Sequence, residues 1–406
     1  MAEFVHVDRI RVSLWGRPVG TLLPSPTPGV YAFAYDYDFL KSGLEISPVV
    51  MPLSERVYQF PDLPKSEYYG LPPVFADSLP DSFGNALIDR WMRERGIEKN
   101  SITALDRLAY VGDRSMGALT YEPEMRRGAA EESVLDMRRL VDESRRALNA
   151  DFAARSGDDA LREIIRVGTS AGGAQAKAVV GWNRTTGEFL AGDGELPDGF
   201  EHWLIKFSPR GLEEAGEKEY GFYEKALACG ITMSECRLYE LDGVRHFMTK
   251  RFDRENGKRL HMQTACALAA MPRHIGREFR SYEHLFTVLE EMNFGYETLE
   301  QLFRRMAFNV LTREMDDHTK NFSFLMRENG RWELAPAYDL TGYHFSPADA
   351  AFFDFENQHA LSVNGKFSAI TDDDLLAVAE RFAIGTAKKV LQQMHSTLNE
   401  GENHGK

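Results

Sequence analysis

Residues 313–340 gather several side chains whose types could do chemistry together. The segment contains DDHTKN, residues 316–321, and a further aspartate at Asp339. Carboxylate and amide oxygens are ligands that suit Mg²⁺, and a carboxylate can also accept a proton from a hydroxyl group. The plainer alternative is a polar helix end whose two adjacent aspartates are merely solvated. A zinc site at His318 is disfavoured, because no second histidine or cysteine lies nearby in the sequence.

The spacing within DDHTKN favours a site for phosphoryl transfer. Asp316 stands five positions before Asn321, which is the spacing of the catalytic loop H-R-D-x-x-x-x-N in protein kinases. In that loop the aspartate accepts the proton of the attacking hydroxyl group, and the asparagine binds a magnesium ion. Kinases then place a short hairpin before a second metal-binding aspartate, and here a predicted hairpin precedes Asp339. The spacing thus predicts Asp316, rather than Asp317, as the base, with Asn321 and Asp339 as metal ligands.

A second candidate is VGTSAGGAQAKAVVGW, residues 167–182, a glycine-rich segment that enters a predicted strand. Glycines allow close backbone approach, so N–H groups in such a segment can reach phosphate oxygens. It is not a Walker A loop, because Ala174 stands where that motif has lysine and a strand follows instead of a helix. The alternative interpretation is an ordinary hairpin turn.

Lys206 is the third candidate. It lies in HWLIKF, residues 202–207, where the alternation puts it on the strand face opposite to the apolar residues. A strand lysine of this kind grips ATP phosphates in kinases and needs a helix glutamate as its partner. Glu219 or Glu224 on the following predicted helix could serve. The alternative is a lysine that extends from an edge strand into solvent.

The elements that would position these residues follow one another in a simple order. The N-terminal part predicts β-hairpins, for example at VSLWGRPVG, and a charged connector from Ser133 predicts a solvated helix pair. Five strands and one helix follow, and helices dominate the last third of the chain. We expect a β-rich N-terminal subdomain at residues 1–125, the connector and a small lobe at 126–250, and a large lobe at 251–406.

Composition and charge exclude several classes of protein. The 406 residues are 43% hydrophobic and 27% charged, enough for two or three cores. A net charge of -14 disfavours direct binding to DNA or anionic membranes and suits a basic protein partner. No signal-peptide pattern is visible, and no uncharged apolar run approaches the roughly 18 residues that span a bilayer. Three cysteines without C-x-x-C spacing indicate a cytoplasmic protein.

Five segments, taken in order, resemble the HipA family of bacterial serine/threonine kinases: SAGGAQAK, HWLIKF, KRFDR, DDHTKN and APAYDL. These are the toxins of HipA–HipB toxin–antitoxin pairs. Upstream, VSLWGRPVGTLLP, FADSLPDSFGNALIDR and LAYVGDRSMGAL resemble the N-terminal subdomain of the family, so the resemblance covers nearly the whole chain. It implies an α+β, bilobal protein-kinase-like fold with an added β-rich N-terminal subdomain and a helical C-terminal lobe.

The resemblance also implies roles for the matching residues. Asp316 is again the expected base, and Asn321 and Asp339 are the expected Mg²⁺ ligands. The residues at 250–252 would form the adenine-side hinge. Ser170 matches the loop serine that family members autophosphorylate, which disorders the loop and silences the kinase. The expected ATP contacts are Ser170, Gly172, Gly173, Ala174, Gln175, Lys177, Lys206, Lys250, Arg251, Phe252, His318, Lys320 and Tyr338.

The sequence departs from these patterns at several positions. Glu-Met at 314–315 replaces the His-Arg of the kinase loop, and Leu-Thr at 340–341 replaces Phe-Gly, so this is not a standard eukaryotic-type kinase. Ala176 stands where the family often has proline, which predicts a more mobile loop. Lys250 stands where some members have glutamate. A backbone contact to adenine would survive that change, whereas a side-chain contact would not.

Together these features predict an ATP- and Mg²⁺-dependent protein serine/threonine kinase that acts as a growth-arresting toxin. The resemblance implies an essential translation protein as substrate, such as glutamyl-tRNA synthetase. It also implies inhibition by a small, basic HipB-like helix-turn-helix antitoxin that brings the complex to operator DNA. The alternatives are a lipid or small-molecule kinase of related fold, and a non-catalytic scaffold that binds the antitoxin.

Overall fold

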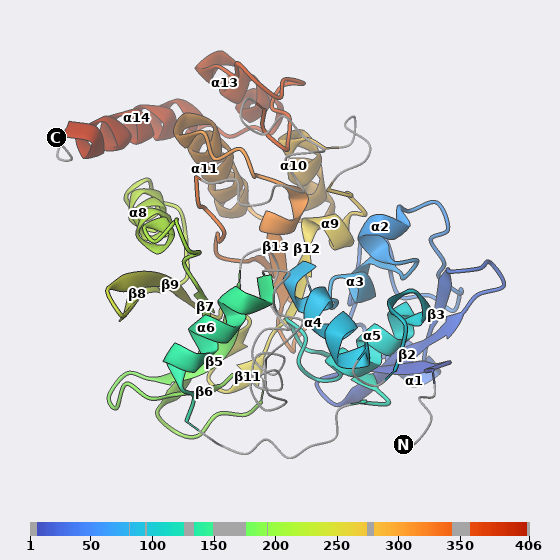
Figure 1. Cartoon of the computed structure of the whole chain (residues 1–406). Coiled ribbons are helices and arrows are strands. Elements are labelled where there is room, and N and C mark those ends of the chain that lie inside the picture. Colours follow the sequence, from blue (N-terminus) through green and yellow to red (C-terminus); the bar gives the residue numbers. More distant parts are fainter. Residues whose placement is uncertain are drawn as a thin grey trace.

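The described part of the chain runs from a β-rich N-terminal region to a helical C-terminal region (Figure 1). The computed structural model describes residues 6–80, 82–93, 96–125, 134–148, 176–192, 194–273, 280–342 and 358–403. The strands form antiparallel sheets and the helices pack beside them, as expected for the predicted α+β class.

The N-terminal region is built on a four-stranded antiparallel sheet with the order β3-β2-β1-β4. Ile10, Val12 and Leu14 alternate with other residues and are fully buried, as expected for a strand with one face on a core. Trp15 and Gly16 have positive φ angles and make the turn of the predicted hairpin. The strands are β1 (Ile10–Leu14), β2 (Arg17–Pro24), β3 (Tyr31–Tyr35) and β4 (Leu119–Glu122).

Helices connect β3 to β4, and most of them contribute residues to the N-terminal core, whereas Ile88 and Met92 are buried in the core of the sheet that follows. Thr103 starts the last of these helices with a capping box, in which its side chain and that of Asp106 bond reciprocally to backbone N–H groups. The elements are α1 (Tyr37–Leu40), α2 (Lys65–Tyr68), α3 (Pro73–Ala76), α4 (Ser82–Arg93), the 3₁₀ helix η1 (Lys99–Ser101) and α5 (Ala104–Val111).

A five-stranded antiparallel sheet, with the order β6-β5-β7-β9-β8, follows the connector. Trp203 and Ile205 of β7 are buried in a core on one face, and Lys206 points to the other face. Helix α8 covers that other face and approaches closely at Gly216, where a Cβ atom would lie 2.3 Å from the carbonyl oxygen of Arg245. The elements are β5 (Lys177–Asn183), β6 (Phe189–Ala191), β7 (Phe200–Lys206), α8 (Ala215–Ala228), β8 (Cys236–Leu241) and β9 (Val244–Lys250).

The connector differs from the predicted solvated helix pair. Its first helix, α6 (Met137–Leu148), buries Met137, Leu140 and Val141 in the core beneath the five-stranded sheet. The 3-4 spacing of these apolar residues gives the helix a packed face, so it is solvated on one side only. The second helix of the predicted pair falls in residues 149–175, outside the described residues.

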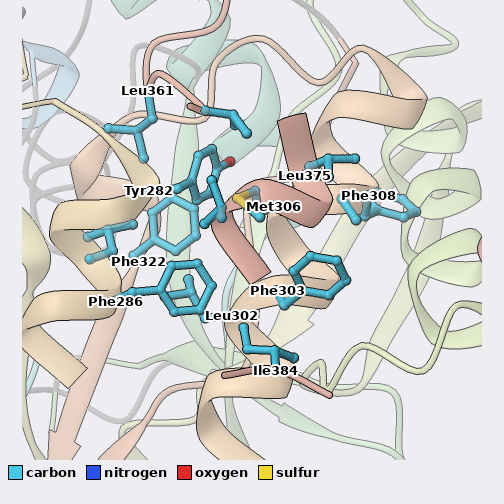
Figure 2. Packing of buried hydrophobic residues seen from close by; sticks show 14 of the residues in the cluster. Tyr282, Phe286, Leu302, Phe303, Met306, Phe308, Phe322, Leu361, Leu375 and Ile384 are labelled. Carbon is cyan, nitrogen blue, oxygen red and sulfur yellow. The ribbon is translucent and has the colours of Figure 1, made fainter. Parts of the chain in front are cut away.

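The C-terminal region packs helices around one large core. Figure 2 shows Phe303 and Met306 of α11 packed among residues from other segments, including Tyr282, Phe286 and Phe322. The helices are α9 (Ala265–Leu268), α10 (Tyr282–Glu291), α11 (Tyr296–Thr312), the 3₁₀ helix η4 (Thr319–Asn321), α13 (Asp372–Arg381) and α14 (Ala387–Asn403). The strands are β10 (Arg254–Glu255), β11 (Lys258–Arg259), β12 (His261–Thr264), β13 (Ser323–Met326) and β14 (Trp332–Leu334).

A buried ionic cluster joins the N-terminal and C-terminal regions. Asp253 is fully buried, and its carboxylate accepts hydrogen bonds from Arg251 at 2.9 and 2.7 Å and from Arg254 at 2.7 Å. The backbone N–H of Gly117, in the N-terminal region, donates to the same carboxylate at 2.7 Å. Arg259 donates to the carbonyl oxygen of Gly117 at 3.0 Å. We call Arg251, Asp253, Arg254 and Arg259 the joint cluster.

Among the residues that the structure describes, no helix is both long enough and apolar enough to cross a membrane.

Candidate active site

The loop DDHTKN follows the buried helix α11. Arg313 takes a left-handed backbone conformation, with φ of 58°, that ends this helix. The loop then folds back, so that Nδ2 of Asn321 donates to the carbonyl oxygen of Asp316 at 2.7 Å. Because this bond uses the amide nitrogen, the amide oxygen of Asn321 is the atom that could bind a cation. The five-residue spacing therefore does bring the predicted base and the predicted ligand together.

Lys206 lies between two carboxylates on the face of the five-stranded sheet that helix α8 covers. Its Nζ is 2.5 Å from Oε1 of Glu219 and 2.5 Å from Oδ1 of Asp339. Glu224, the other candidate partner, is exposed on the same helix, so Glu219 is the partner. Burial alone would lower the pKa of Lys206, but the Asp339 and Glu219 carboxylates raise it above its ordinary value. The ammonium group is therefore charged.

Asp339 follows the β13–β14 hairpin, as predicted from the sequence. Its φ of 59° is rare for a residue other than glycine, and such conformations gather at functional sites. Burial would raise the pKa of Asp339, but Lys206 and Lys177 together lower it to about 2. The carboxylate is therefore ionised at neutral pH, while 28% of its side chain stays exposed.

The predicted base and both predicted metal ligands line one pocket. Asp316, Asn321 and Asp339 lie around it, with Glu314 and Tyr338 beside them. Within the described ranges no group of three histidine, cysteine or acidic residues forms a metal cage. An open site with Asn321 and Asp339 as its protein ligands fits Mg²⁺, because this ion keeps waters and substrate phosphates as its remaining ligands.

Lys177 adds a second cation to the same face. It pairs with Lys206 across β5 and β7, and both lysines are buried. Its charge helps to lower the pKa of Asp339, and it opposes the burial that raises the pKa of Glu219 to about 7. The expected phosphate-binding residues just before it lie outside the described residues; these are Ser170, Gly172, Gly173, Ala174 and Gln175.

Two expected ATP contacts, Lys320 and Tyr338, have side chains that bond within the protein, and a third, His318, has a mostly buried side chain. His318 is mostly buried, its Nε2 is 3.8 Å from Oδ1 of Asp316, and burial lowers the pKa of His318 to about 3, so the ring is neutral. The Nζ of Lys320 lies 2.6 Å from a carboxylate oxygen of Glu67 in the N-terminal region. The Tyr338 hydroxyl donates to the carbonyl oxygen of Lys320 at 2.5 Å. These side chains shape the loop, and their contacts to a nucleotide stay predictions.

Of the expected hinge residues, two have side chains bound elsewhere in the protein and one has its side chain next to the site. The Nζ of Lys250 pairs with Glu201 on the sheet, and Arg251 belongs to the joint cluster. The ring of Phe252 packs 5.5 Å from that of Tyr338, next to Asp339. Phe252 is thus connected to the site through its side chain, the guanidinium of Arg251 is bound within the joint cluster, and the contacts of the three hinge residues to an adenine stay predictions.

Two carboxylates of the loop have contacts that the sequence did not predict. Glu314 was visible there only as a departure from the kinase pattern, and Asp317 as a solvated neighbour of Asp316. Both are buried, with 1% of each residue exposed. The only available signal in the sequence was an excess of acidic residues around the predicted base. That excess does not indicate a role until the partners of these residues are known.

Comparisons with known proteins agree over most of the chain. Residues 10–122 match the HipA N-terminal domain, and residues 169–401 match the HipA-like C-terminal domain. The serine/threonine-protein kinase toxin HipA of Shewanella oneidensis is 23% identical over 86% of this chain and 77% of that protein. The protein Y4dM of Sinorhizobium fredii, named as a kinase, is 25% identical over 48% of this chain, which spans about half of its length (51%).

A solved structure gives the same result for the fold. The complex of HipA, HipB and operator DNA from Shewanella oneidensis MR-1 contains a chain that matches with a TM-score of 0.68 and 18% identity. The match covers 95% of this chain and 88% of the other. This likeness confirms the predicted fold class.

Proposed function

Because this chain belongs to the HipA family, we propose that it is a serine/threonine protein kinase that uses ATP and Mg²⁺ and acts as a growth-arresting toxin. The family rests on the match over residues 169–401, which is more than half of the 406 residues. The proposed activity rests on the site described above.

The observation that carries the proposal is the meeting of Asp316, Asn321 and Asp339 in one pocket, with the Lys206–Glu219 pair bound to Asp339. Phosphoryl transfer needs positioning and charge neutralisation more than covalent chemistry. A base, two oxygen ligands and a buried ammonium group supply those needs. They come from three separate parts of the sequence, namely the loop DDHTKN, the segment after the β13–β14 hairpin and strand β7.

Each residue would have a distinct task in the transfer. When bound at Asn321 and Asp339, Mg²⁺ would neutralise charge on the phosphates of ATP. Lys206, held in place by Glu219, would donate hydrogen bonds to phosphate oxygens of ATP. Asp316 would take the proton of the attacking hydroxyl as the new O–P bond forms and the bond to ADP breaks. A hydroxyl can reach this aspartate, because 38% of its side chain is exposed.

The proposal includes a protein partner and a protein target. A HipB-like helix-turn-helix antitoxin that brings the complex to operator DNA is supported by the matching HipA–HipB–DNA structure. The net charge of -14 suits such a basic partner and disfavours direct contact with DNA. By resemblance, the target is an essential translation protein such as glutamyl-tRNA synthetase, and Ser170 is the site of autophosphorylation.

Transfer of label from γ-³²P-ATP tests the enzymatic part. The purified protein with Mg²⁺ should label proteins in a bacterial lysate and should label itself, and Ser170→Ala should lose the self-labelling. Label on purified phosphoinositides but on no protein would support a lipid kinase instead. A protein that labels nothing while it still binds a HipB-like antitoxin would be a scaffold.

Growth of bacteria that express the chain tests the toxin part. Expression should stop growth, and co-expression of a small helix-turn-helix protein encoded beside the gene should restore it. Unchanged growth at a protein level that gives measurable kinase activity would contradict the assignment as a toxin.

A further inference from the structure

Glu314, two positions before the proposed base, is buried among backbone N–H groups. Its Oε2 accepts hydrogen bonds from the N–H groups of Thr341 and Gly342, both at 2.6 Å. Its Oε1 accepts a weaker bond from the N–H of Asp316 at 3.2 Å. Thr341 and Gly342 come directly after Leu340 and the proposed metal ligand Asp339. One carboxylate therefore joins the loop that carries the base to the chain that carries the ligand.

Asp317 makes a second connection of the same kind. Its Oδ1 accepts a hydrogen bond from the backbone N–H of Ala360 at 2.7 Å. Its Oδ2 accepts one from the Tyr282 hydroxyl at 2.7 Å and lies 3.1 Å from Nδ1 of His359. The chain that leaves the site after Gly342 is thus fixed again at Ala360, and both points of attachment are carboxylates of the catalytic loop.

These contacts are strong enough to set a geometry. Hydrogen bonds from N–H groups to a carboxylate are charge-assisted and about twice as strong as neutral ones. A buried carboxylate without such donors would be strongly unfavourable. The positions of the donors therefore determine where each carboxylate can lie. Many kinases order the chain after the metal-binding aspartate with an arginine that binds a phosphorylated residue. Here Met315 occupies the position of the arginine in H-R-D, so that device is missing from the loop.

We propose that Glu314 and Asp317 are positioning residues for phosphoryl transfer, which fix the distance between Asp316 and Asp339 by holding both ends of the chain that follows Asp339. The inference rests on the proposed kinase function. Glu314 holds the near end and acts on Asp339, whereas Asp317 holds the far end through Ala360.

Hydrogen exchange of the backbone amides tests the contacts directly, without Mg²⁺ or ATP. In Glu314→Gln, the peptide that contains Thr341 and Gly342 should exchange about tenfold faster, the effect of losing roughly 1.4 kcal/mol of local protection. The peptide that contains Ala360 should stay as in the wild type. In Asp317→Asn the peptide that contains Ala360 should exchange faster, and the peptide that contains Thr341 and Gly342 should stay as in the wild type. Glu328→Gln, in an exposed turn, is the matched control.

The kinetic test is the Mg²⁺ concentration that gives half-maximal transfer at saturating ATP. It is measured at pH 8, because burial raises the pKa of Glu314 to about 7. The half-maximal concentration should rise about tenfold in Glu314→Gln and stay unchanged in Glu328→Gln. Glu314→Asp, whose carboxylate is one methylene shorter, is made in parallel, and it should shift the Mg²⁺ requirement in the same direction even if Glu314→Gln does not fold.

Three results would overturn the inference, and one of them would also overturn the proposed function. Faster exchange over the whole chain, with an unchanged Mg²⁺ requirement in whichever Glu314 variants fold, would show a purely structural role and overturn the inference alone. A failure of both Glu314 variants to fold would overturn it in the same way. A wild-type protein without any transfer would overturn the proposed function, and the inference with it.

Discussion

The active-site pocket and the joint cluster are both built from buried charges, but they use them in opposite ways. In the joint cluster, the side chains of Arg251, Asp253 and Arg254 are at most 9% exposed and bond to one another and to the N-terminal backbone. In the pocket, Asp339 is bound to Lys206 on one side and keeps 28% of its side chain exposed on the other.

The difference shows how buried charges with the same chemistry serve structure or function. A charge whose hydrogen-bonding capacity is filled by fixed protein groups holds the fold together, and removing one partner leaves the others uncompensated. A charge with an exposed side toward a pocket can still bind a ligand. The motif KRFDR illustrates the distinction, because the family resemblance implied a nucleotide hinge at residues 250–252, whereas the side chains of Arg251 and Asp253 bond within the joint cluster.

Replacing Asp253 should have the largest effect on stability. Asp253→Asn leaves two buried guanidinium groups without their carboxylate, so we expect a loss of about 3–5 kcal/mol in the free energy of unfolding. Urea unfolding followed by circular dichroism measures it. Asp242→Asn, in an exposed hairpin turn with positive φ that asparagine tolerates, should change stability by less than about 0.5 kcal/mol. Equal effects of the two variants would contradict the structural role of the joint cluster.

The pH dependence of the stability difference between wild type and Asp253→Asn tests the ion pairs of the joint cluster further. Burial would raise the pKa of Asp253, but Arg251 and Arg254 hold it well below its usual range. A group with a lowered folded-state pKa contributes stability that is complete above its unfolded pKa of about 3.9 and is lost as the pH falls. The difference between wild type and Asp253→Asn should therefore be smaller by roughly 0.7 kcal/mol at about pH 3.5 than at neutral pH. A constant difference would refute the ion pairing.

Replacing Glu219 should have a smaller effect than replacing Asp253, and this effect should appear in catalytic activity. Glu219→Gln removes the carboxylate that holds Lys206 on one side, and activity is measured at pH 8 because burial raises the pKa of Glu219 to about 7. We expect kcat/KM for ATP to fall about tenfold, which corresponds to ~1.4 kcal/mol of transition-state stabilisation. Steady-state kinetics with varied ATP measure it. Glu224→Gln, exposed on the same helix, should leave kcat/KM unchanged, and a similar loss in both variants would show that the pairing with Lys206 is unimportant.

An exposed ionic network should show the smallest effect. Arg184 lies 2.5 Å from both Glu201 and Glu235, but its side chain is 34% exposed and solvent screens the attraction. We expect Arg184→Ala to reduce the free energy of unfolding by less than about 1 kcal/mol and to leave kinase activity unchanged. A loss as large as that of Asp253→Asn would contradict the contrast between surface and buried charges.

The sequence predicted the parts of the site that local rules determine. The spacing of Asp316 and Asn321 is fixed within one loop, the hairpin before Asp339 is signalled by its own turn, and the alternation in β7 assigns the face of Lys206. Contacts between distant segments were not predictable in this way. The choice between Glu219 and Glu224 depends on how α8 is rotated against the sheet, which no local pattern states.

The loop contacts show the same limit more clearly. Lys320 was expected at ATP because it stands in the motif, but its ammonium group lies against Glu67 of the N-terminal region. Glu314 and Asp317 bind backbone N–H groups, which have no side-chain signature in a sequence. Any residue type can donate such bonds, so only the folded chain identifies the partners.

The most direct test of the proposed site is phosphate transfer by Asp316→Asn under single-turnover conditions. Loss of the base should slow transfer from ATP to protein by a factor of about 10²–10⁴. Binding of Mg-ATP, measured as a rise in melting temperature, should stay because Lys206 and Asp339 are intact. Transfer at the wild-type rate by a folded Asp316→Asn protein would contradict the assignment of this pocket as the active site.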